Sequence, residues 1–406
     1  MNVIFIEPSF PYNQREFVRA LHATGANVIG IGERPARHLT DDLKTWLGDY
    51  VQVQSVVHEP SLLQAVQAVQ RELWVDRLEA TVEAHIMPAA VVREATGIPG
   101  TSARTAYLCR DKPAMKEALR RAGVPCAQST RATNAQEARD FADAVGYPLI
   151  IKPPAGAGAS GTYQVHDVGR LERVIVECGL ADGHAVAVEE FIEGHEGYID
   201  TLTISGEVVH EFITHYYPNV LEAMRTRWIS PQMVTTNRID EPGYREVRDL
   251  TRKVIRILEI GTSATHMEWF FGPKGLKFSE IGCRPPGVGQ WDVYNAANEF
   301  DLYSEWASAI TRGRTNSQPS RRYAAGMIAL RPDRDGRITG YSGAEDINRH
   351  YGDCIVAAHL PDQGTPTQPV EGGYMANAWL RLRHPDYDAL RRILDDIGQT
   401  LKVHAA

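Results

Sequence analysis

The N-terminal part of the chain alternates between two hydrophobic patterns. Short apolar runs typical of buried strands occupy residues 3–8 (VIFIEP) and 27–32 (NVIGIG), and residues 80–85 are a further strand candidate. Apolar residues at helical spacing predict helices over residues 13–25, with Asn13 as N-cap, and over 61–73. Strands that alternate with helices predict a parallel α/β sheet.

The pattern changes beyond residue 110. Helices are predicted from the caps Asp111 and Asn134, and a long amphipathic helix over residues 244–261. Strands are predicted over residues 184–191 and 198–217, in one antiparallel sheet with a turn at Ser205 and Gly206. Further predictions are a strand–turn–strand over residues 264–282, mixed strands beyond residue 321, a surface loop over 361–373 and a final helix over 387–401.

Composition narrows the class of protein. A chain of 406 residues with 43% hydrophobic and 23% charged residues is typical of a globular protein of two to four domains. The net charge of -8 argues against a nucleic-acid partner. The five cysteines form no Cys-x-x-Cys pair and are expected to be reduced packing residues. No signal peptide and no apolar run of membrane-spanning length is recognisable, so we expect a cytoplasmic protein without a membrane partner.

A stretch of small residues, PLIIKPPAGAGASGTYQV at 148–165, separates two predicted strands. Lys152 precedes the glycines and a strand follows them, so neither a P-loop nor a dinucleotide fingerprint fits. Gly30 and Gly32 lack the third glycine of that fingerprint. A glycine-rich hairpin can fold over a triphosphate and donate backbone N–H groups, with Lys152 as a point charge. The alternative is a mobile hairpin with a surface lysine.

Two carboxylates lie on the arms of the predicted strand–turn–strand. Glu268 and Glu280 can fall on one face of this hairpin, and Arg284 follows. Two carboxylates about 4 Å apart repel by about 4 kcal/mol at an effective dielectric near 20, which a divalent cation would reverse. Oxygen ligands beside a nucleotide indicate Mg²⁺. The alternative is two solvated strand residues, and His266 is more often a hydrogen-bonded structural residue than a ligand or base.

Five segments, taken in order, resemble the ATP-grasp enzymes. They are CRDKPAMKEALRRAGVP (109–125), PLIIKPPAGAGASG (148–161), VEEFIEGHEG (188–197), HMEWFF (266–271) and FSEIGCRPPG (278–287). The resemblance runs from about Val3 to Arg312, and the tail is similar to the C-terminal domain of the biotin-carboxylase-like branch. It implies an N-terminal parallel α/β domain (1–105), an ATP-grasp domain with antiparallel sheets (106–314, lid subdomain about 125–190) and a small α+β domain (315–406).

The resemblance also implies a role for particular residues. Phosphates would be held by Lys112 and Lys152, with a lid loop formed by Gly156, Gly158, Ser160 and Gly161. Adenine would be met by Glu189 and by the backbone of Glu190, Phe191 and Ile192, and the ribose by Glu196. The Mg²⁺ ligands would be Glu268 and Glu280, and Mn²⁺ can substitute. Arg284 would be catalytic and steady the transferred phosphate, with Lys152 assisting. One departure is Gly282, because many members have an asparagine ligand there.

The activity implied is that of a carboxylate–amine ligase that forms an amide through an acyl phosphate, with ADP and phosphate as products. The alternatives are a purine-pathway-type or carboxylating enzyme, or a regulatory protein that binds ATP without catalysis. Substrates are expected to be small and amino-acid-like. Arg225 and Arg227 could clamp a carboxylate and Trp228 could form a pocket wall, although a packed loop with solvated arginines fits equally well. A homodimer is the commonest assembly.

Overall fold

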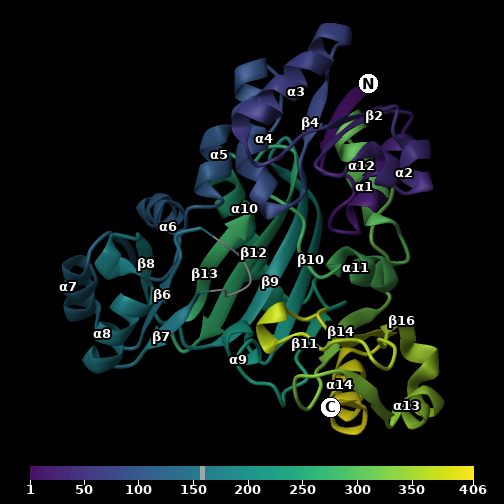
Figure 1. Ribbon diagram of the computed structural model, residues 1–406. Coiled ribbons are helices and arrows are strands. Elements are labelled where there is room, and N and C mark those ends of the chain that lie inside the picture. The colour runs from purple at the N-terminus through teal and green to yellow at the C-terminus, as the bar shows by residue number, and fades with distance from the viewer. Residues whose placement is uncertain (156–160) are drawn as a thin grey trace.

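We describe the protein from a computed structural model, and the description covers residues 1–155 and 161–406. In these residues the strands form four β-sheets (Figure 1). We call three of them the parallel sheet (β3-β2-β1-β4), the small sheet (β5-β8-β6-β7) and the large sheet (β13-β12-β9-β10-β11-β14-β17-β16). The fourth pairs β15 with β18.

The parallel sheet confirms the predicted N-terminal α/β pattern. Its elements are β1 (Asn2–Ile6), α1 (Gln14–Ala23), β2 (Asn27–Gly32), α2 (Asp41–Trp46), β3 (Asp49–Gln52), α3 (Glu59–Glu72), β4 (Arg77–Glu79) and α4 (Glu83–Thr96). Two predictions are wrong. Asn13 has helical backbone angles and its side chain does not cap α1, and the strand expected at 80–85 ends at Glu79, before α4 begins.

Gly30 and Gly32 have a packing role on β2. A Cβ atom would lie 2.8 Å from the ring of Tyr50 at Gly30 and 2.6 Å from the Tyr50 hydroxyl at Gly32. A side chain at either position would therefore have to displace Tyr50, and this packing accounts for the two glycines without a dinucleotide.

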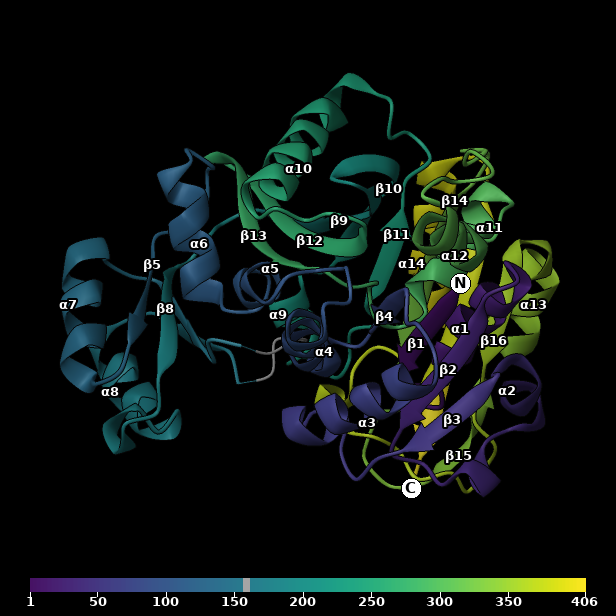
Figure 2. The same ribbon diagram turned by 90° about the horizontal axis from the view of Figure 1, so that it is seen from above.

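The small sheet is antiparallel, and α7 and α8 pack against it (Figure 2). The elements of this region are α5 (Ala103–Leu108), α6 (Lys112–Arg121), β5 (Ser129–Ala132), α7 (Ala135–Val145), β6 (Leu149–Lys152), β7 (Tyr163–Val165), α8 (Val168–Glu177) and β8 (Val186–Glu190). The side chains of Asp111 and Asn134 cap α6 and α7, as predicted. The predicted hairpin is also confirmed, because β6 and β7 pair with Ile150 opposite Gln164.

The large sheet is antiparallel throughout its pairings. Its strands are β9 (His195–Ile204), β10 (Glu207–Tyr217), β11 (Gln232–Thr235), β12 (Ser263–Gly272), β13 (Gly275–Gly282), β14 (Ala324–Leu330), β16 (Ile355–His359) and β17 (Ala378–His384). Ser205 and Gly206 have positive φ angles of 51° and 87° and form the tight turn predicted between β9 and β10. The strand at 184–191 does not share this sheet, because it forms β8 of the small sheet.

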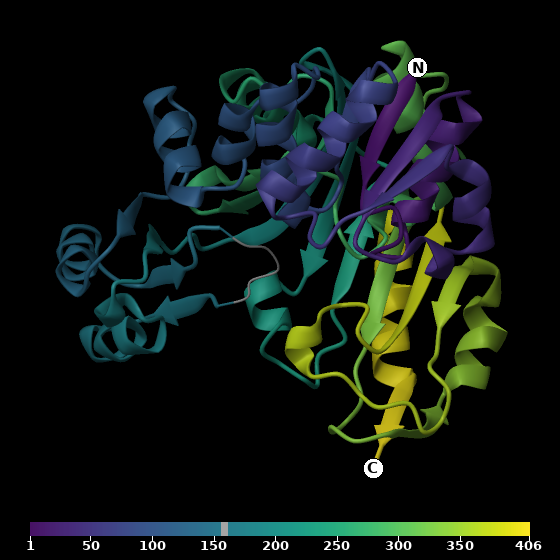
Figure 3. The ribbon, with the colours of Figure 1, turned by 45° about the horizontal axis from the view of Figure 1, so that its top comes forward.

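Helices cover the large sheet and join it to the parallel sheet (Figure 2). The remaining elements are α9 (Val220–Ala223), α10 (Arg245–Ile257), α11 (Gln290–Asn298), α12 (Leu302–Arg312), β15 (Ile338–Ser342), α13 (Ala344–Tyr351), α14 (Tyr387–Thr400) and β18 (Lys402–Ala405). Three strands of the large sheet, β14, β16 and β17, come from the C-terminal part of the chain, so one sheet spans the predicted boundary at 314. Figure 3 shows the small sheet and its helices on the opposite side of the large sheet from the C-terminal elements.

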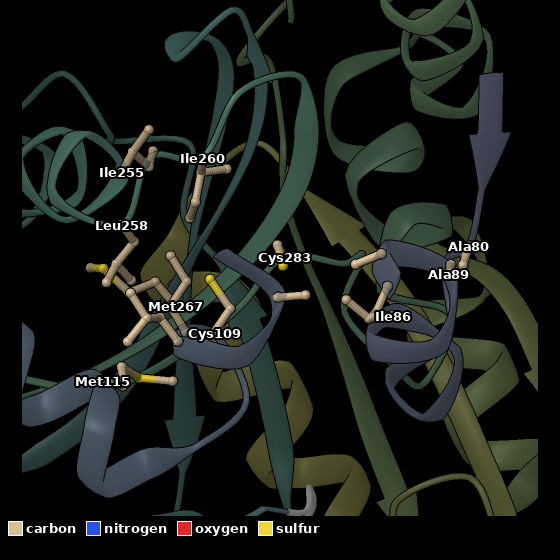
Figure 4. Close-up of a cluster of buried hydrophobic side chains, with 14 of the residues drawn as sticks. Ala80, Ile86, Ala89, Cys109, Met115, Ile255, Leu258, Ile260, Met267 and Cys283 are labelled. Carbon is tan, nitrogen blue, oxygen red and sulfur yellow. The ribbon is translucent and has the colours of Figure 1, made fainter. Parts of the chain in front are cut away.

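A sulfur-rich part of the largest hydrophobic cluster lies between α5, α6 and the large sheet. Figure 4 shows Cys109, Met115, Met267 and Cys283 gathered there, and all four are buried. A hydrogen bond with Cys283 and burial raise the pKa of the Cys109 thiol. All five cysteines are free, and these two have the packing role predicted. Among the described residues, no helix combines the length and apolar character that crossing a membrane requires.

Candidate active site

A cavity of about 840 Å³ lies between the small sheet and the large sheet. The small sheet contributes residues of β6 and β8, and the large sheet contributes residues of β9, β10, β12 and β13. Helix α6, helix α9, the segment after β13 and single residues of β7 and β11 also line the cavity. The cavity has the size and the mixed lining of a small-molecule site.

Two lysines reach the cavity from different elements. Lys112 is the first residue of α6, and Lys152 is the last residue of β6. Their Nζ atoms lie 3.2 and 3.9 Å from Oε2 of Glu280. The backbone N–H of Lys112 donates to the carbonyl of Pro154 at 2.9 Å, which fixes the start of α6 against the end of β6. The structure thus brings together two lysines that are far apart in the sequence.

A third lysine, Lys116, was missed by the sequence analysis. Its side chain is 1% exposed, and its Nζ lies 2.6 Å from Oε2 of Glu189, which Lys152 contacts at 2.9 Å. Burial lowers the pKa of Lys116 to about 8, against the charge of Glu189. Burial alone would raise the pKa of Glu189, but the charges of Lys116 and Lys152 lower it to about 2. The position of Lys116 four residues after Lys112, one helical turn later, was the available signal.

Glu189 was expected beside an adenine amino group, and in the structure its carboxylate also forms ion pairs with two lysines. Oε2 joins Lys116 of α6 to Lys152 of β6, while Oε1 is buried with no hydrogen-bond partner in residues 1–155 and 161–406. The open oxygen is an acceptor at the cavity wall.

Two backbone N–H groups of the segment that was expected to contact adenine already form hydrogen bonds within the protein. The N–H groups of Glu190 and Phe191 donate to Gln128 and Pro148. The predicted contact with an adenine edge would therefore depend on other groups of this segment, such as Ile192, which lines the cavity. The Glu190 side chain turns to Lys274, whose Nζ lies 2.6 Å away.

Glu268 and Glu280 are direct cross-strand partners on β12 and β13, and both line the cavity. Glu196 of β9 lies near them. Burial, and to a smaller extent the charge of Glu268, raises the pKa of Glu196 to about 8. Its Oε2 accepts a hydrogen bond from the Val220 N–H at 2.7 Å.

This donor set fits Mg²⁺. The described residues contain no group of three or more His, Cys, Asp or Glu side chains arranged as a complete metal site. Mg²⁺ usually takes one or two carboxylates plus phosphate oxygens and water, which matches a pair such as Glu268 and Glu280 beside a phosphate site.

His266 holds one of these carboxylates in place. Its Nδ1 lies 2.6 Å from Oδ1 of Asp200, and its Nε2 lies 3.6 Å from Oε1 of Glu268. Burial opposes the charge of the imidazole, but Asp200 raises the pKa of His266 to about 9. Tyr294 donates to the other oxygen of Asp200. The alternation of His266 and Glu268 on β12 places both on the cavity side, as expected for a strand.

Arg284 is anchored by the N-terminal part of the chain. Its Nε donates to Oε2 of Glu83 at 2.8 Å, and Glu83 begins α4. A Cβ atom on Gly282 would lie 3.4 Å from both Oε2 of Glu83 and Cγ of Arg284. A Cβ atom at position 282 would thus be in ordinary van der Waals contact with this ion pair.

The expected substrate clamp is not assembled as proposed from the sequence. Arg225 lines the cavity, and its Nη2 donates to the carbonyl of Thr162 at 2.6 Å. Arg227 instead pairs with Asp335 at 2.7 Å, and Trp228 is 88% exposed, so neither reaches the cavity. Tyr374, directly after the predicted surface loop, does line the cavity, and its buried hydroxyl has no hydrogen-bond partner within the described ranges.

The predicted lid residues are described only in part. Gly156, Gly158 and Ser160 lie outside the described residues. Gly161 has a positive φ angle of 65°, which a residue with a side chain rarely adopts.

Comparisons with known proteins agree with this geometry. Residues 111–210 match the family described as carbamoyl-phosphate synthase L chain, ATP binding domain. The chain is 27% identical over 220 residues to the L-arginine-specific L-amino acid ligase of Bacillus subtilis, covering 53% of this chain and 52% of that protein. It thus spans about half the length of the curated relatives it matches.

Solved structures resemble the whole fold. The L-amino acid ligase of Bacillus licheniformis has a TM-score of 0.78 at 16% identity, covering 100% of this chain and 98% of that chain. The biotin carboxylase domain dimer of the Hydrogenobacter thermophilus 2-oxoglutarate carboxylase, a complex with MgADP, ADP and bicarbonate, has a TM-score of 0.67 at 17% identity, covering 99% and 90%.

The predicted fold class and the predicted resemblance to the ATP-grasp ligases are confirmed. Two of these similar proteins are L-amino acid ligases, in agreement with the prediction of an enzyme.

Proposed function

We propose that the protein is an ATP-dependent carboxylate–amine ligase that joins amino-acid-like substrates through an acyl phosphate. The observation that carries the proposal is the cross-strand pair Glu268 and Glu280, set in one cavity with Lys112 and Lys152. Carboxylates suited to a metal and lysines suited to phosphates lie side by side, since both lysine Nζ atoms are within 4 Å of Glu280. The likeness to amino acid ligases supports the substrate class.

Two displacements make up the reaction. A carboxylate oxygen of the first substrate attacks the γ-phosphorus of ATP, the bond from phosphorus to the bridging oxygen breaks, and ADP leaves. The nitrogen of the amine then attacks the acyl carbon, the carbon–oxygen bond to phosphate breaks, and the nitrogen loses a proton as the amide forms.

The residues of the cavity act by position and charge. Lys112 and Lys152 neutralise phosphate oxygens, and Arg284, held by Glu83, steadies the transferred phosphoryl group. Mg²⁺ held by Glu268 and Glu280 would neutralise the charge that develops on the β- and γ-phosphates. Glu196 would accept hydrogen bonds from the ribose. The two sheets that enclose the cavity limit the access of water, which protects an acyl phosphate from hydrolysis.

The test is a screen for phosphate release with ATP, Mg²⁺ and pairs of amino acids, followed by mass spectrometry. We expect ADP, phosphate and an amide product. The exposed Glu193 offers a matched control, since Glu193→Gln should retain the activity that Glu280→Gln loses. AMP among the products would contradict an acyl phosphate, and ADP formed without any carboxylate would indicate a kinase or ATPase. Phosphate release that requires bicarbonate or formate would favour the carboxylating or purine-pathway alternative.

A further inference from the structure

The segment at residues 285–289 leads from Arg284 to helix α11, and its residues 286–288 line the cavity of the candidate active site. Val288 has a φ angle of 52° and Gly289 one of 61°, so two consecutive residues adopt left-handed backbone conformations. For a β-branched residue such as valine this conformation is an outlier. Outliers of this kind persist only where the surrounding structure holds them, and they cluster at active sites. A residue that holds Val288 is therefore expected.

Arg381 of β17 holds this segment. Its buried guanidinium donates from Nη2 to the carbonyl of Val288 at 3.2 Å and from Nη1 to Oδ2 of Asp292 at 2.8 Å. Asp292 lies in the first turn of α11, so one planar guanidinium joins the left-handed residue to the start of the helix. The two donors point in fixed directions, a geometry that the single ammonium group of lysine does not reproduce.

The guanidinium of Arg381 is itself fixed by its neighbours. It lies 4.5 Å from the centre of the Trp379 ring. A Cβ atom on Gly289 would overlap Nη2, so the guanidinium occupies the space that a side chain there would need. Tyr303 of α12 donates to the second oxygen of Asp292 at 3.1 Å, which orients this carboxylate. The bonds to the segment therefore come from an ordered group rather than from a mobile surface side chain.

The wall to which Val288 belongs is apolar. Val288 packs against a hydrophobic cluster, and four members of this cluster also line the cavity. These members are Tyr198, Tyr216, Met233 and Tyr374. Apolar and aromatic linings contact the apolar parts of a small ligand, whereas phosphates are bound by charged groups and N–H donors. A displacement of Val288 should therefore affect a substrate side chain more than the phosphates of a nucleotide.

Arg284, at the other end of the segment, is held by separate bonds. Its Nε donates to Oε2 of Glu83 at 2.8 Å, and its Nη1 donates to the carbonyl of Pro285 at 2.8 Å. The loss of Arg381 would release the Val288 end of the segment and would leave these bonds of Arg284 in place.

We propose that Arg381 is a positioning residue for one amino-acid-like substrate. By holding Val288 in its left-handed conformation, Arg381 sets the apolar wall against which the side chain of that substrate lies. Arg381 acts through Val288 and takes no part in the chemical steps. The identity of the ligand rests on the proposed ligase function, whereas the conformation of the segment does not.

A second arginine on β17 provides a matched control. Arg383 lies two positions after Arg381, on the same face of the strand, and its Nη1 donates to the carbonyl of Ala296 at 3.2 Å. Ala296 is in the middle of α11, so Arg383 also joins β17 to this helix. Its bond is not with the segment at 285–289. A purely structural role of Arg381 would therefore be shared by Arg383.

The first measurement is steady-state kinetics of the full chain with ATP and the pair of amino acids that the product screen identifies. Arg381→Gln should raise the KM for one amino acid about tenfold, with kcat within about threefold and the KM for ATP within about twofold. Arg381→Lys should give an intermediate KM, because lysine keeps the charge but not the two fixed donors. Arg383→Gln should leave all three KM values within about twofold.

The second measurement, hydrogen exchange followed by mass spectrometry, needs no turnover. Two backbone N–H groups at the start of α11 donate to the carbonyls of Gly287 and Gly289, at 3.1 Å each. Peptides that cover residues 285–292 should exchange at least about tenfold faster in Arg381→Gln than in the wild type, because the turn opens more often. The same peptides should exchange at the wild-type rate in Arg383→Gln.

Asp292→Asn tests the same contacts if Arg381→Gln does not fold. The Asp292 side chain is 43% exposed, so a neutral amide is tolerated at this position. The substitution removes the charge that pairs with Arg381 and keeps the Val288 carbonyl. The same KM and the same exchange rate should each rise at least about twofold.

Three results would each overturn the proposal. They are an equal rise of the same KM in Arg381→Gln and Arg383→Gln, unchanged KM values for both amino acids in Arg381→Gln, and unchanged exchange in Arg381→Gln. A wild type that forms no amide would instead remove the proposed ligase function. The exchange comparison then decides alone: faster exchange only in Arg381→Gln supports the hold on Val288, and equal exchange in the two variants contradicts it.

Discussion

The two sides of the candidate active site are built differently. One side, which we propose binds phosphate and call the phosphate side, consists of Lys112, Lys116, Lys152, Glu189 and Glu280, joined by ion pairs across α6, β6, β8 and β13. The other side, which we propose binds substrate and call the substrate side, combines residues from distant parts of the chain, with Glu83 from the N-terminal part, Arg284 after β13 and Tyr374 before β17. The phosphate side is a cluster of charged residues on helices and strands. The substrate side forms only when distant parts of the chain come together in the tertiary fold. Variants on the two sides should therefore fail in different ways.

The largest effect is expected where the two sides meet. Arg284→Ala and Glu280→Ala should each lower kcat by roughly 100-fold or more, because each removes a group that stabilises charge in the transition state. Steady-state phosphate release measures this effect. Near wild-type turnover in either variant would remove that residue from the site.

The next effect concerns stability on the phosphate side. Lys116→Met should lower the free energy of unfolding by about 2–3 kcal/mol, because it leaves a buried carboxylate with one cation fewer. The loss is below the full value for a broken buried pair, since Lys152 still contacts Glu189 at 2.9 Å. Urea denaturation measures it, with the exposed neighbour Glu117→Gln as control. A loss below about 0.5 kcal/mol would mean that Lys116, Glu189 and Lys152 do not form a structural unit.

A smaller effect is expected on the substrate side. Tyr374→Phe removes a buried hydroxyl that has no hydrogen-bond partner among the described residues, so the stability of the protein should not fall. If a bound ligand accepts this hydrogen bond, the KM for that ligand should rise about 2- to 10-fold. Separate KM values for ATP and for each substrate identify the ligand. Tyr351→Phe, which loses a surface hydrogen bond to Asp396, is the control. Unchanged KM values for ATP and for every substrate would mean that the Tyr374 hydroxyl forms no hydrogen bond with a bound ligand.

The smallest effect separates two neighbouring arginines. Arg227→Ala should leave KM values within about twofold and stability within about 0.5 kcal/mol, because Arg227 pairs with Asp335 outside the cavity. Arg225→Ala should raise a KM more than Arg227→Ala does, because Arg225 lines the cavity and donates to Thr162. A larger rise in KM for Arg227→Ala than for Arg225→Ala would instead support the role of Arg227 in the carboxylate clamp predicted from the sequence.

The contrast between the two sides also explains what could be read from the sequence. Lys112, Lys152, Glu268 and Glu280 lie in short segments whose spacing indicates their chemistry, and the structure brings them to one cavity. Their individual roles remain predictions. Lys116 could have been found, since it lies one helical turn after Lys112.

Glu83 and Tyr374 could not have been found in this way. Glu83 is separated from Arg284 by 201 positions, and no local pattern encodes a contact between the start of α4 and the segment after β13. Tyr374 follows a segment rich in proline and glycine, which correctly indicates a loop but not the cavity that the loop reaches. In the fold, hydrophobic periodicity predicted the parallel sheet. Strand β8 was assigned to the wrong sheet, because the sequence pattern of a strand does not identify the strand with which it pairs.

The central claim is that this cavity activates a carboxylate as an acyl phosphate, and oxygen-isotope transfer tests it most directly. A carboxylate substrate labelled with ¹⁸O is converted with unlabelled ATP, and the inorganic phosphate is analysed by mass spectrometry. We predict that one ¹⁸O atom moves from the carboxylate to the phosphate in each turnover, and that Glu280→Ala abolishes the transfer. Amide formation with unlabelled phosphate, or with the label in AMP, would contradict the account.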